Sequence, residues 1–213
     1  MSSARQGSRC YLIARAERPG LTPEAIERTF ASLEVSCMLL TQGRQSPIDL
    51  DCARPMIDAV HGHDVACFIE NDVQAVLKLG ADGLHIDADL ETYHAARRAL
   101  GPDRQIGVAC GHSRHRAMVL AENGADYVAF GNGAELLRPS WETAELIEWW
   151  SQLFEVPCVA WRPSGVEEAH LYAERGADFV ALDDELWLRD DDESGVDAGL
   201  GAIFSGAGGV LGK

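Results

Sequence analysis

A threefold repeat is the feature of this sequence that most restricts its possible folds. Gly80-Ala81-Asp82, Gly124-Ala125-Asp126 and Gly176-Ala177-Asp178 each follow a stretch with helical periodicity and precede a short apolar run. A glycine just past a helix, with an apolar run after it, is typical of a helix C-cap that leads into a buried strand. The copies lie 44 and 52 residues apart, which is about two strand–helix units each. The repeat therefore predicts one α/β unit that recurs around a closed or an extended sheet.

Short continuous apolar runs, which mark strands buried on both faces, number eight in all. They lie at residues 10–14, 35–40, 65–69, 83–86, 106–110, 127–130, 157–160 and 179–182. Helical periodicity fills the intervals, at residues 23–33, 48–59, 73–79, 90–100, 115–123, 141–153 and 166–175. Eight strands that alternate with helices in about 200 residues predict a compact (β/α)8 TIM barrel. An open, doubly wound sheet is the alternative, but no GxGxxG loop follows the first apolar run.

The chain divides into three parts on this interpretation. Residues 1–9 form a polar N-terminal lead, and residues 10–188 form the (β/α)8 barrel. Residues 189–213 form an acidic loop and a glycine-rich C-terminal segment, with a short helix expected near 198–204.

The charge balance excludes several classes of partner. Eighteen basic against 34 acidic residues give a formal net charge of −16, which would repel nucleic acids and anionic membranes. No apolar run approaches the roughly 20 residues that span a bilayer, and the N-terminus shows no secretory signal. The six cysteines include no CxxC pair and are interpreted as buried thiols in a reducing compartment. These features predict a cytoplasmic protein.

The working residues of such a barrel lie where each strand ends, because the βα loops gather at that face. Six carboxylates follow the predicted strands, and Arg162 is the clearest cation among them; the carboxylates are Glu70, Asp72, Asp87, Asp89, Asp183 and Asp184. Asp72 and Asp89 follow neighbouring strands and could share one Mg²⁺ ion, which prefers oxygen ligands. The same two residues could instead cap the helices that begin at residues 73 and 90. The spacing leaves both interpretations open.

The loops after the seventh and eighth strands commonly hold phosphate in barrels, through glycine N–H groups. Here they contain Trp161, Arg162 and Pro163, and then two aspartates. Proline has no N–H and aspartates repel phosphate, so we expect the usual phosphate site to be lost.

Four ordered segments resemble the thiamine phosphate synthase family and its TenI-like relatives. The segments are Phe68-Ile69-Glu70-Asn71-Asp72, Gly80-Ala81-Asp82-Gly83-Leu84-His85-Ile86, Ile106-Gly107-Val108-Ala109-Cys110-Gly111-His112-Ser113 and Gly124-Ala125-Asp126-Tyr127-Val128-Ala129-Phe130-Gly131. The family is a small (β/α)8 barrel, in agreement with the pattern of strands. Its members couple hydroxymethylpyrimidine diphosphate to thiazole phosphate and release pyrophosphate, with Mg²⁺ neutralising the leaving group.

The resemblance implies roles for particular residues. Asp72, in the Asn-Asp motif, and Asp89, if one residue is deleted from its loop, would bind Mg²⁺ in an active enzyme. Gln42, Asn71 and His112 would contact the substrates. Arg44 or Arg162 would replace the family's anion-binding residues, and Asn132 and Ser164, in loops that depart from the family, are further candidate substrate contacts. The chain also departs from the family. Of the glutamine, arginine and lysine that bind pyrophosphate after strand two in the family, this chain keeps Gln42 and, in a shifted position, Arg44 as a possible second. The Thr-x-Thr-Lys loop after strand six is absent.

Three hypotheses about function follow. The first is a thiamine phosphate synthase-like protein of thiamine biosynthesis that binds phosphorylated small molecules. The second is a non-catalytic small-molecule-binding or regulatory barrel that has lost the residues that bind phosphate. The third is a divergent enzyme for a neutral or cationic substrate, which an acidic mouth would favour. Whether the chain is an active enzyme stays open at this point, and a homodimer is expected only by analogy with the family.

Overall fold

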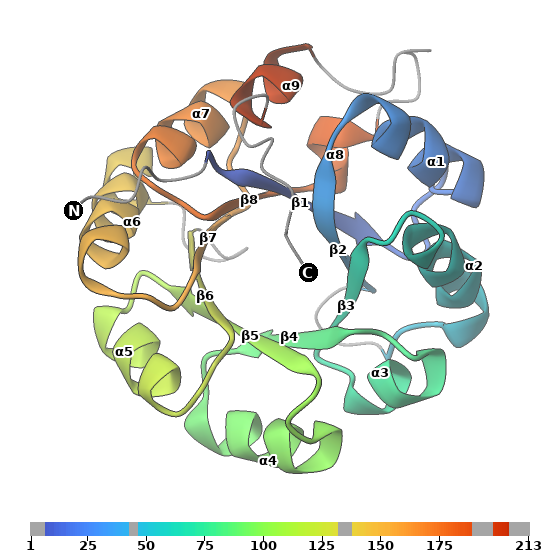
Figure 1. Ribbon diagram of the computed structural model, residues 1–213, viewed down its shortest axis with the longest axis horizontal. Helices are drawn as coiled ribbons and strands as arrows, with labels where there is room; N and C mark the ends of the chain where they lie inside the picture. Colours follow the sequence, from blue (N-terminus) through green and yellow to red (C-terminus); the bar gives the residue numbers. More distant parts are fainter. Residues whose placement is uncertain (1–6, 43–46, 132–137, 189–197, 205–213) are drawn as a thin grey trace.

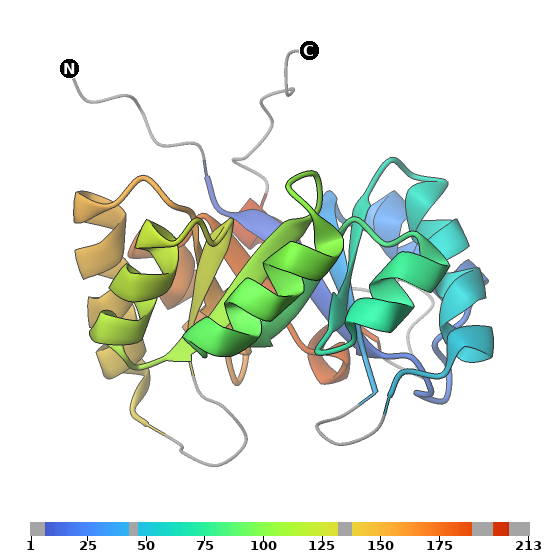
Figure 2. The same ribbon diagram turned by 90° about the horizontal axis from the view of Figure 1, so that it is seen from below.

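The computed structural model describes residues 7–42, 47–131, 138–188 and 198–204. Eight parallel strands pair in chain order and close into a barrel, and helices surround it (Figures 1 and 2). The strands are β1 (Arg9–Arg15), β2 (Val35–Thr41), β3 (Ala66–Glu70), β4 (Gly83–Asp87), β5 (Gln105–Gly111), β6 (Tyr127–Gly131), β7 (Cys158–Trp161) and β8 (Phe179–Leu182). The predicted (β/α)8 barrel is confirmed, and the alternative of an open sheet is wrong because β1 pairs with β8.

The helices lie close to the predicted ranges. They are α1 (Pro23–Ser32), α2 (Leu50–His61), α3 (Val73–Leu79), α4 (Leu90–Leu100), α5 (Arg114–Glu122), α6 (Ser140–Leu153), α7 (Val166–Glu174), α8 (Asp184–Trp187) and α9 (Ala198–Phe204). The four-residue α8 was not predicted, since it is too short to show a helical period. Thr22 caps α1, with Pro23 in its first turn. Within the described ranges, no helix has the length and apolar character needed to cross a membrane.

The repeated Gly-Ala-Asp segment has a definite structural role. Gly80, Gly124 and Gly176 have φ angles of 74°, 93° and 93°, a left-handed conformation that favours glycine after a helix. The aspartate of each copy then makes two bonds to the strand before it in sequence. Its side chain accepts a backbone N–H and its own N–H donates to the carbonyl of the same residue; the partners are Cys67 for Asp82, Ile106 for Asp126 and Cys158 for Asp178. We call this pair of bonds the aspartate clamp.

The core has two parts, one between the strands and the helices and one inside the barrel. The interior part is built largely from aromatic rings, among them Tyr11, Phe68, Tyr127 and Trp161. Glycines make room for two of these rings: a Cβ on Gly83 would lie 2.4 Å from the Phe68 ring, and one on Gly107 would lie 1.9 Å from the Tyr127 ring. Five of the six cysteines are buried. The barrel is therefore packed along its axis and is not a pore.

Candidate functional site

The carboxyl ends of the strands form one face of the barrel, which we call the mouth. Alternation along the strands turns Arg15 of β1, Thr41 of β2 and Glu70 of β3 toward the barrel axis at this end. The hydroxyl of Thr41 donates to the Glu70 carboxylate. Arg15 is the register partner of Thr41, so a guanidinium lies beside the end of β2.

Two arginines near the end of β1 hold one buried carboxylate. Asp184, the first residue of α8, is 1% exposed and accepts from Arg15 Nε at 3.2 Å and Arg18 Nη1 at 2.9 Å. It also accepts from the Arg15 backbone N–H at 3.2 Å. The bonds to Asp184 raise the pKa of the Arg15 guanidinium. The Arg18 side chain is 17% exposed, whereas half of the Arg15 side chain is exposed.

These arginines border a hollow at the mouth. The hollow has a volume of about 350 Å³, and its walls are Arg15, Glu17, Arg18, Pro19 and Gln42. Gln42 Oε1 accepts the backbone N–H of Asp49, the N-cap of α2, which fixes the amide at the hollow's edge. Gln42 was predicted from the sequence as a substrate contact, whereas Arg15 and Arg18 were not. The alternation of Tyr11, Ile13 and Arg15 along β1 was the signal that could have found Arg15.

A second ion pair joins the ends of β7 and β8. Arg162 has φ 51° and donates from Nη1 to Asp183 Oδ2 at 3.0 Å. Burial raises the pKa of Asp183, and the Arg162 guanidinium offsets part of that effect. The backbone N–H of Ser164 donates to Glu168, so this loop is tied to α7. Asp183 and Asp184 therefore lie at the mouth with Arg162, and each of them binds arginine, so their negative charges are partly neutralised.

The carboxylates predicted to bind metal both cap helices. Asp72 Oδ1 accepts the Ala75 N–H at 2.9 Å, and Asp89 Oδ2 accepts the Thr92 N–H at 2.8 Å and its hydroxyl at 2.7 Å. The bonds from Thr92 lower the pKa of Asp89. Each carboxylate uses one oxygen in its cap and leaves a second oxygen for another ligand. Among the described residues, no three His, Cys, Asp or Glu side chains form a group that could hold a metal.

Asn71 lies between these elements in a left-handed conformation, with φ 54°. Its N–H donates to the carbonyl of His85 at 2.9 Å, which joins the end of β3 to β4. Asparagine tolerates this conformation better than most residues.

Aromatic rings close the barrel interior below the mouth. Trp161 is 8% exposed and stacks on the His85 ring, with centroids 4.1 Å apart. His85 Nδ1 lies 2.8 Å from the Tyr127 hydroxyl, which in turn lies 2.9 Å from the Tyr11 hydroxyl. Burial lowers the pKa of His85 to about 3, so the imidazole is neutral at pH 7. A ligand at the mouth would therefore lie above Trp161, outside the packed interior.

His112 follows β5 and is held against α6. Its Nε2 lies 2.9 Å from the Thr143 hydroxyl. Burial lowers its pKa, and nearby Arg138 acts in the same direction. The ring can therefore make one hydrogen bond to a ligand through Nδ1, as a donor or as an acceptor according to its tautomer. Arg44 and Asn132, the remaining predicted contacts, lie outside the described residues.

The fold and the position of these groups define a class: a (β/α)8 barrel with arginines, amides and carboxylates where barrel enzymes place their chemistry. A family model described as thiamine monophosphate synthase matches residues 10–186. This chain belongs to that family.

Known proteins with related sequences bear the same name. The chain is 37% identical over 195 residues to the thiamine-phosphate synthase of Erythrobacter litoralis, covering 85% of this chain and 89% of the relative. It is 35% identical over 192 residues to that of Rhodospirillum centenum, covering 84% and 89%. The chain is therefore thiamine phosphate synthase-like over most of its length.

Solved structures support the fold. The thiamine phosphate pyrophosphorylase of Pyrococcus furiosus superposes with a TM-score of 0.76 at 17% identity, covering 94% of this chain and 97% of that one. A 3-hexulose-6-phosphate synthase from Salmonella typhimurium gives a TM-score of 0.67 at 16% identity, covering 92% and 99%.

Proposed function

We propose that this chain is an active thiamine phosphate synthase that works at the mouth of the barrel, in the cytoplasm. It would couple hydroxymethylpyrimidine diphosphate to thiazole phosphate and release pyrophosphate. The observation that carries the proposal is the hollow formed by Arg15, Arg18 and Gln42. Both substrates carry phosphate groups, and guanidinium donors match phosphate oxygens in geometry and charge.

Arg15 would add to the few polar residues that remain after β2. In this chain β2 ends at Thr41, Gln42 follows it, and Arg15 lies beside Thr41 in the sheet register. Nε and Nη2 of Arg15 bind Asp184, and Nη1 takes no part in these bonds. Because half of the side chain is exposed, Nη1 can reach an anion in the hollow. The phosphate would thus be bound from the end of β1 as well as from the residues that follow β2.

Asp72 and Asp89 would hold the Mg²⁺ ion that the family implies. The second oxygen of each carboxylate gives two hard ligands, and Mg²⁺ usually completes its shell with water and substrate phosphate. The bound ion would neutralise charge on the departing pyrophosphate. Asn71, His112, Arg162 and Ser164 border the same face and would orient the substrates, with Arg44 and Asn132 as further contacts.

The direct test is to incubate the purified chain with both substrates and Mg²⁺ and to measure thiamine phosphate. Rescue of a thiamine-requiring strain that lacks its synthase provides the cellular counterpart. Arg15→Gln should lower kcat/KM about 10- to 100-fold, since a charge-assisted hydrogen bond contributes roughly 1.5–3 kcal/mol. Arg98→Gln, at an exposed position on α4, is the matched control and should keep full activity. A folded protein with neither product nor rescue would overturn the proposal.

A non-catalytic binding barrel is the second candidate. The observation that favours it is that, within the described part of the mouth, Arg15 and Arg18 pair with Asp184 and Arg162 pairs with Asp183. In that case the chain would bind pyrophosphate or thiazole phosphate in calorimetry and form no product. Sedimentation of the same sample would test the homodimer expected from the family.

A further inference from the structure

Glu70 and His85 lie side by side on neighbouring strands at the floor of the mouth. They are register partners on β3 and β4, and both side chains point into the barrel. Glu70 Oε2 accepts the hydroxyl of Thr41, whereas Oε1 takes part in no bond to the described part of the chain. Glu70 is only partly buried and, among the residues that the structure describes, has no ion pair. One oxygen of this carboxylate is therefore available to a ligand.

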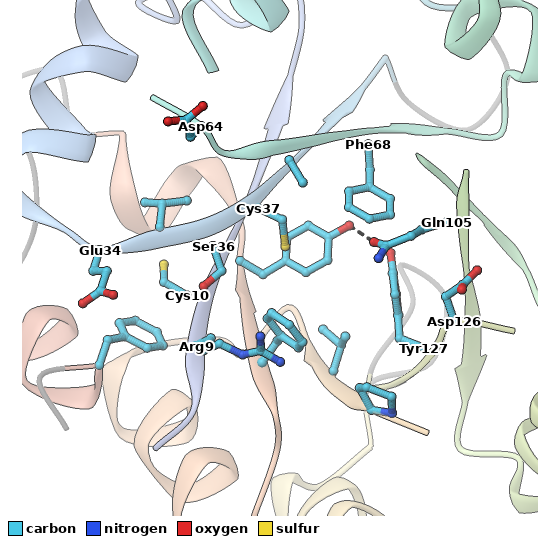
Figure 3. Close-up of a pocket in the computed structure, with 17 residues that line it drawn as sticks. Arg9, Cys10, Glu34, Ser36, Cys37, Asp64, Phe68, Gln105, Asp126 and Tyr127 are labelled. Carbon is cyan, nitrogen blue, oxygen red and sulfur yellow. Dashed lines mark hydrogen bonds between the residues drawn. The ribbon is translucent and has the colours of Figure 1, made fainter. Parts of the chain in front are cut away.

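His85 contributes a second unsatisfied polar group. Its side chain is 1% exposed, and its Nε2 is buried without a hydrogen-bond partner. Nδ1 lies 2.8 Å from the hydroxyl of Tyr127, which lines a cavity at the opposite end of the barrel (Figure 3). Nε2 is on the other edge of the ring and is therefore directed away from Tyr127, toward the mouth. A buried nitrogen without a partner costs free energy, which a ligand that bonds to it would recover.

Trp161 covers one face of the His85 ring, and its indole N–H does not hold it there. The two rings stack with centroids 4.1 Å apart. The indole N–H groups of Trp150 and Trp187 donate to backbone carbonyls, whereas no residue in the described part of the chain accepts from Trp161. Turning the Trp161 side chain therefore breaks no hydrogen bond of the indole. With the indole in place a ligand lies above it, and a side-chain movement of the kind that often accompanies binding would admit the edge of the ligand to His85.

We propose that Glu70 and His85 recognise the edge of an aminopyrimidine ring, and that the mouth selects its pyrimidine substrate in this way. The amino group would donate to Glu70 Oε1, and the adjacent ring nitrogen would accept from His85 Nε2. The imidazole is neutral at pH 7, so it carries its proton on Nε2 when Tyr127 donates to Nδ1. The unpaired carboxylate repels phosphate, which would bind instead in the hollow beside Arg15 and Arg18. The identity of the ring rests on the proposed function, whereas the match to a donor beside an acceptor does not.

Three ring compounds without phosphate test this site: 4-aminopyrimidine, 4-methylpyrimidine and aniline. The first offers the amino donor and the adjacent acceptor, the second only ring nitrogens that accept, and the third only the amino donor. Each is titrated into the full-length protein, and binding is followed in ¹H–¹⁵N NMR spectra. 4-Aminopyrimidine should bind most tightly, with 4-methylpyrimidine about 10-fold weaker and aniline about fivefold weaker, because a hydrogen bond to a carboxylate is worth more than one between neutral groups. The His85 Nε2 and Trp161 indole signals should move, whereas the indole signals of Trp150 and Trp187 should stay.

Substitution of Glu70 locates the site. Glu70→Gln keeps the size of the side chain and an oxygen for the Thr41 hydroxyl, and it should weaken 4-aminopyrimidine about 10-fold. In the assay with both substrates it should raise the KM for the pyrimidine diphosphate by a similar factor and leave the KM for thiazole phosphate unchanged. Glu122→Gln, exposed at the end of α5, is the matched control and should change neither value.

The outcomes separate this site from the proposed activity. Equal affinity for the three compounds, unchanged affinity in Glu70→Gln, a His85 Nε2 signal that does not move, or no binding at all would each overturn the inference. The ring-nitrogen signal is measured on the unaltered protein, so this arm does not depend on whether a variant folds. Binding of 4-aminopyrimidine at Glu70 by a chain that forms no thiamine phosphate would support the site and overturn the proposed function.

Discussion

The most decisive stability prediction concerns Asp184. Substitution to Asn removes the charge that Arg15 and Arg18 share, and leaves Arg18 83% buried beside a neutral amide. Breaking a buried ion pair costs about 3–5 kcal/mol, and an Asn that still accepts one hydrogen bond places the loss near 3 kcal/mol. Half of the Arg15 side chain is exposed, so its pair adds little to this figure.

The expected shift in melting temperature follows from chain length. With an unfolding entropy of about 2.1 cal/mol/K per residue, 213 residues give roughly 0.45 kcal/mol per degree. Asp184→Asn should therefore lower Tm by about 7 °C in calorimetry and shift the urea midpoint accordingly. The additional change Arg18→Met should recover part of the loss, because it removes the unpaired charge.

Glu148→Gln is the control for the ion pair of Asp184. Its pair with Arg175 has both side chains about 40% exposed, so it should cost less than about 1 kcal/mol. A loss below 1 kcal/mol for Asp184→Asn, equal to that of the control, would refute the reasoning that burial gives the cluster its stabilising effect.

Three further predictions concern the interior and the mouth. The unfolded chain gains a proton on His85 below pH 6.5 that the folded chain, with a pKa of about 3, does not bind. The free energy of unfolding should therefore fall by about 1.4 kcal/mol per pH unit from pH 6.5 toward 4, and urea titrations of His85→Gln should lack that slope; identical slopes would contradict the assignment. Gly107→Ala should destabilise by about 1–3 kcal/mol, because its Cβ would meet the Tyr127 ring, whereas Gly201→Ala, with open space around it, should not; equal denaturation midpoints would argue against the packing account. Asp72→Asn should abolish Mg²⁺ binding in calorimetry and keep a normal Tm, since Asn also caps helices; unchanged Mg²⁺ binding would leave Asp72 as a cap only.

The strands and most helices were predictable because their signals are local. The eight apolar runs and the helical periods depend on neighbouring residues alone, and the Gly-Ala-Asp repeat marks the turns between them. The short α8 escaped prediction, since four residues span little more than one helical turn.

The charge pattern of the mouth was not predictable in the same way. Asp184 follows an apolar strand and belongs to an acidic stretch, which favours an exposed carboxylate in any local interpretation. Its partners Arg15 and Arg18 come from the other end of the barrel sequence, and only closure of β1 onto β8 brings them together. Arg162 was predicted as a mouth cation, but its pairing with Asp183 likewise depends on the tertiary fold.

The aspartate clamp suggests how this barrel could be recombined. It joins β3 to the residue just before β4, β5 to the residue just before β6, and β7 to the residue just before β8. Each of these three strand pairs, which we call a couple, is therefore held together by the same two bonds. Chimeras between homologous barrels should keep each couple intact and place their crossover points in α4 or α6, which connect one couple to the next. Crossovers in α3, α5 or α7 would draw the aspartate and its backbone partner from different parents.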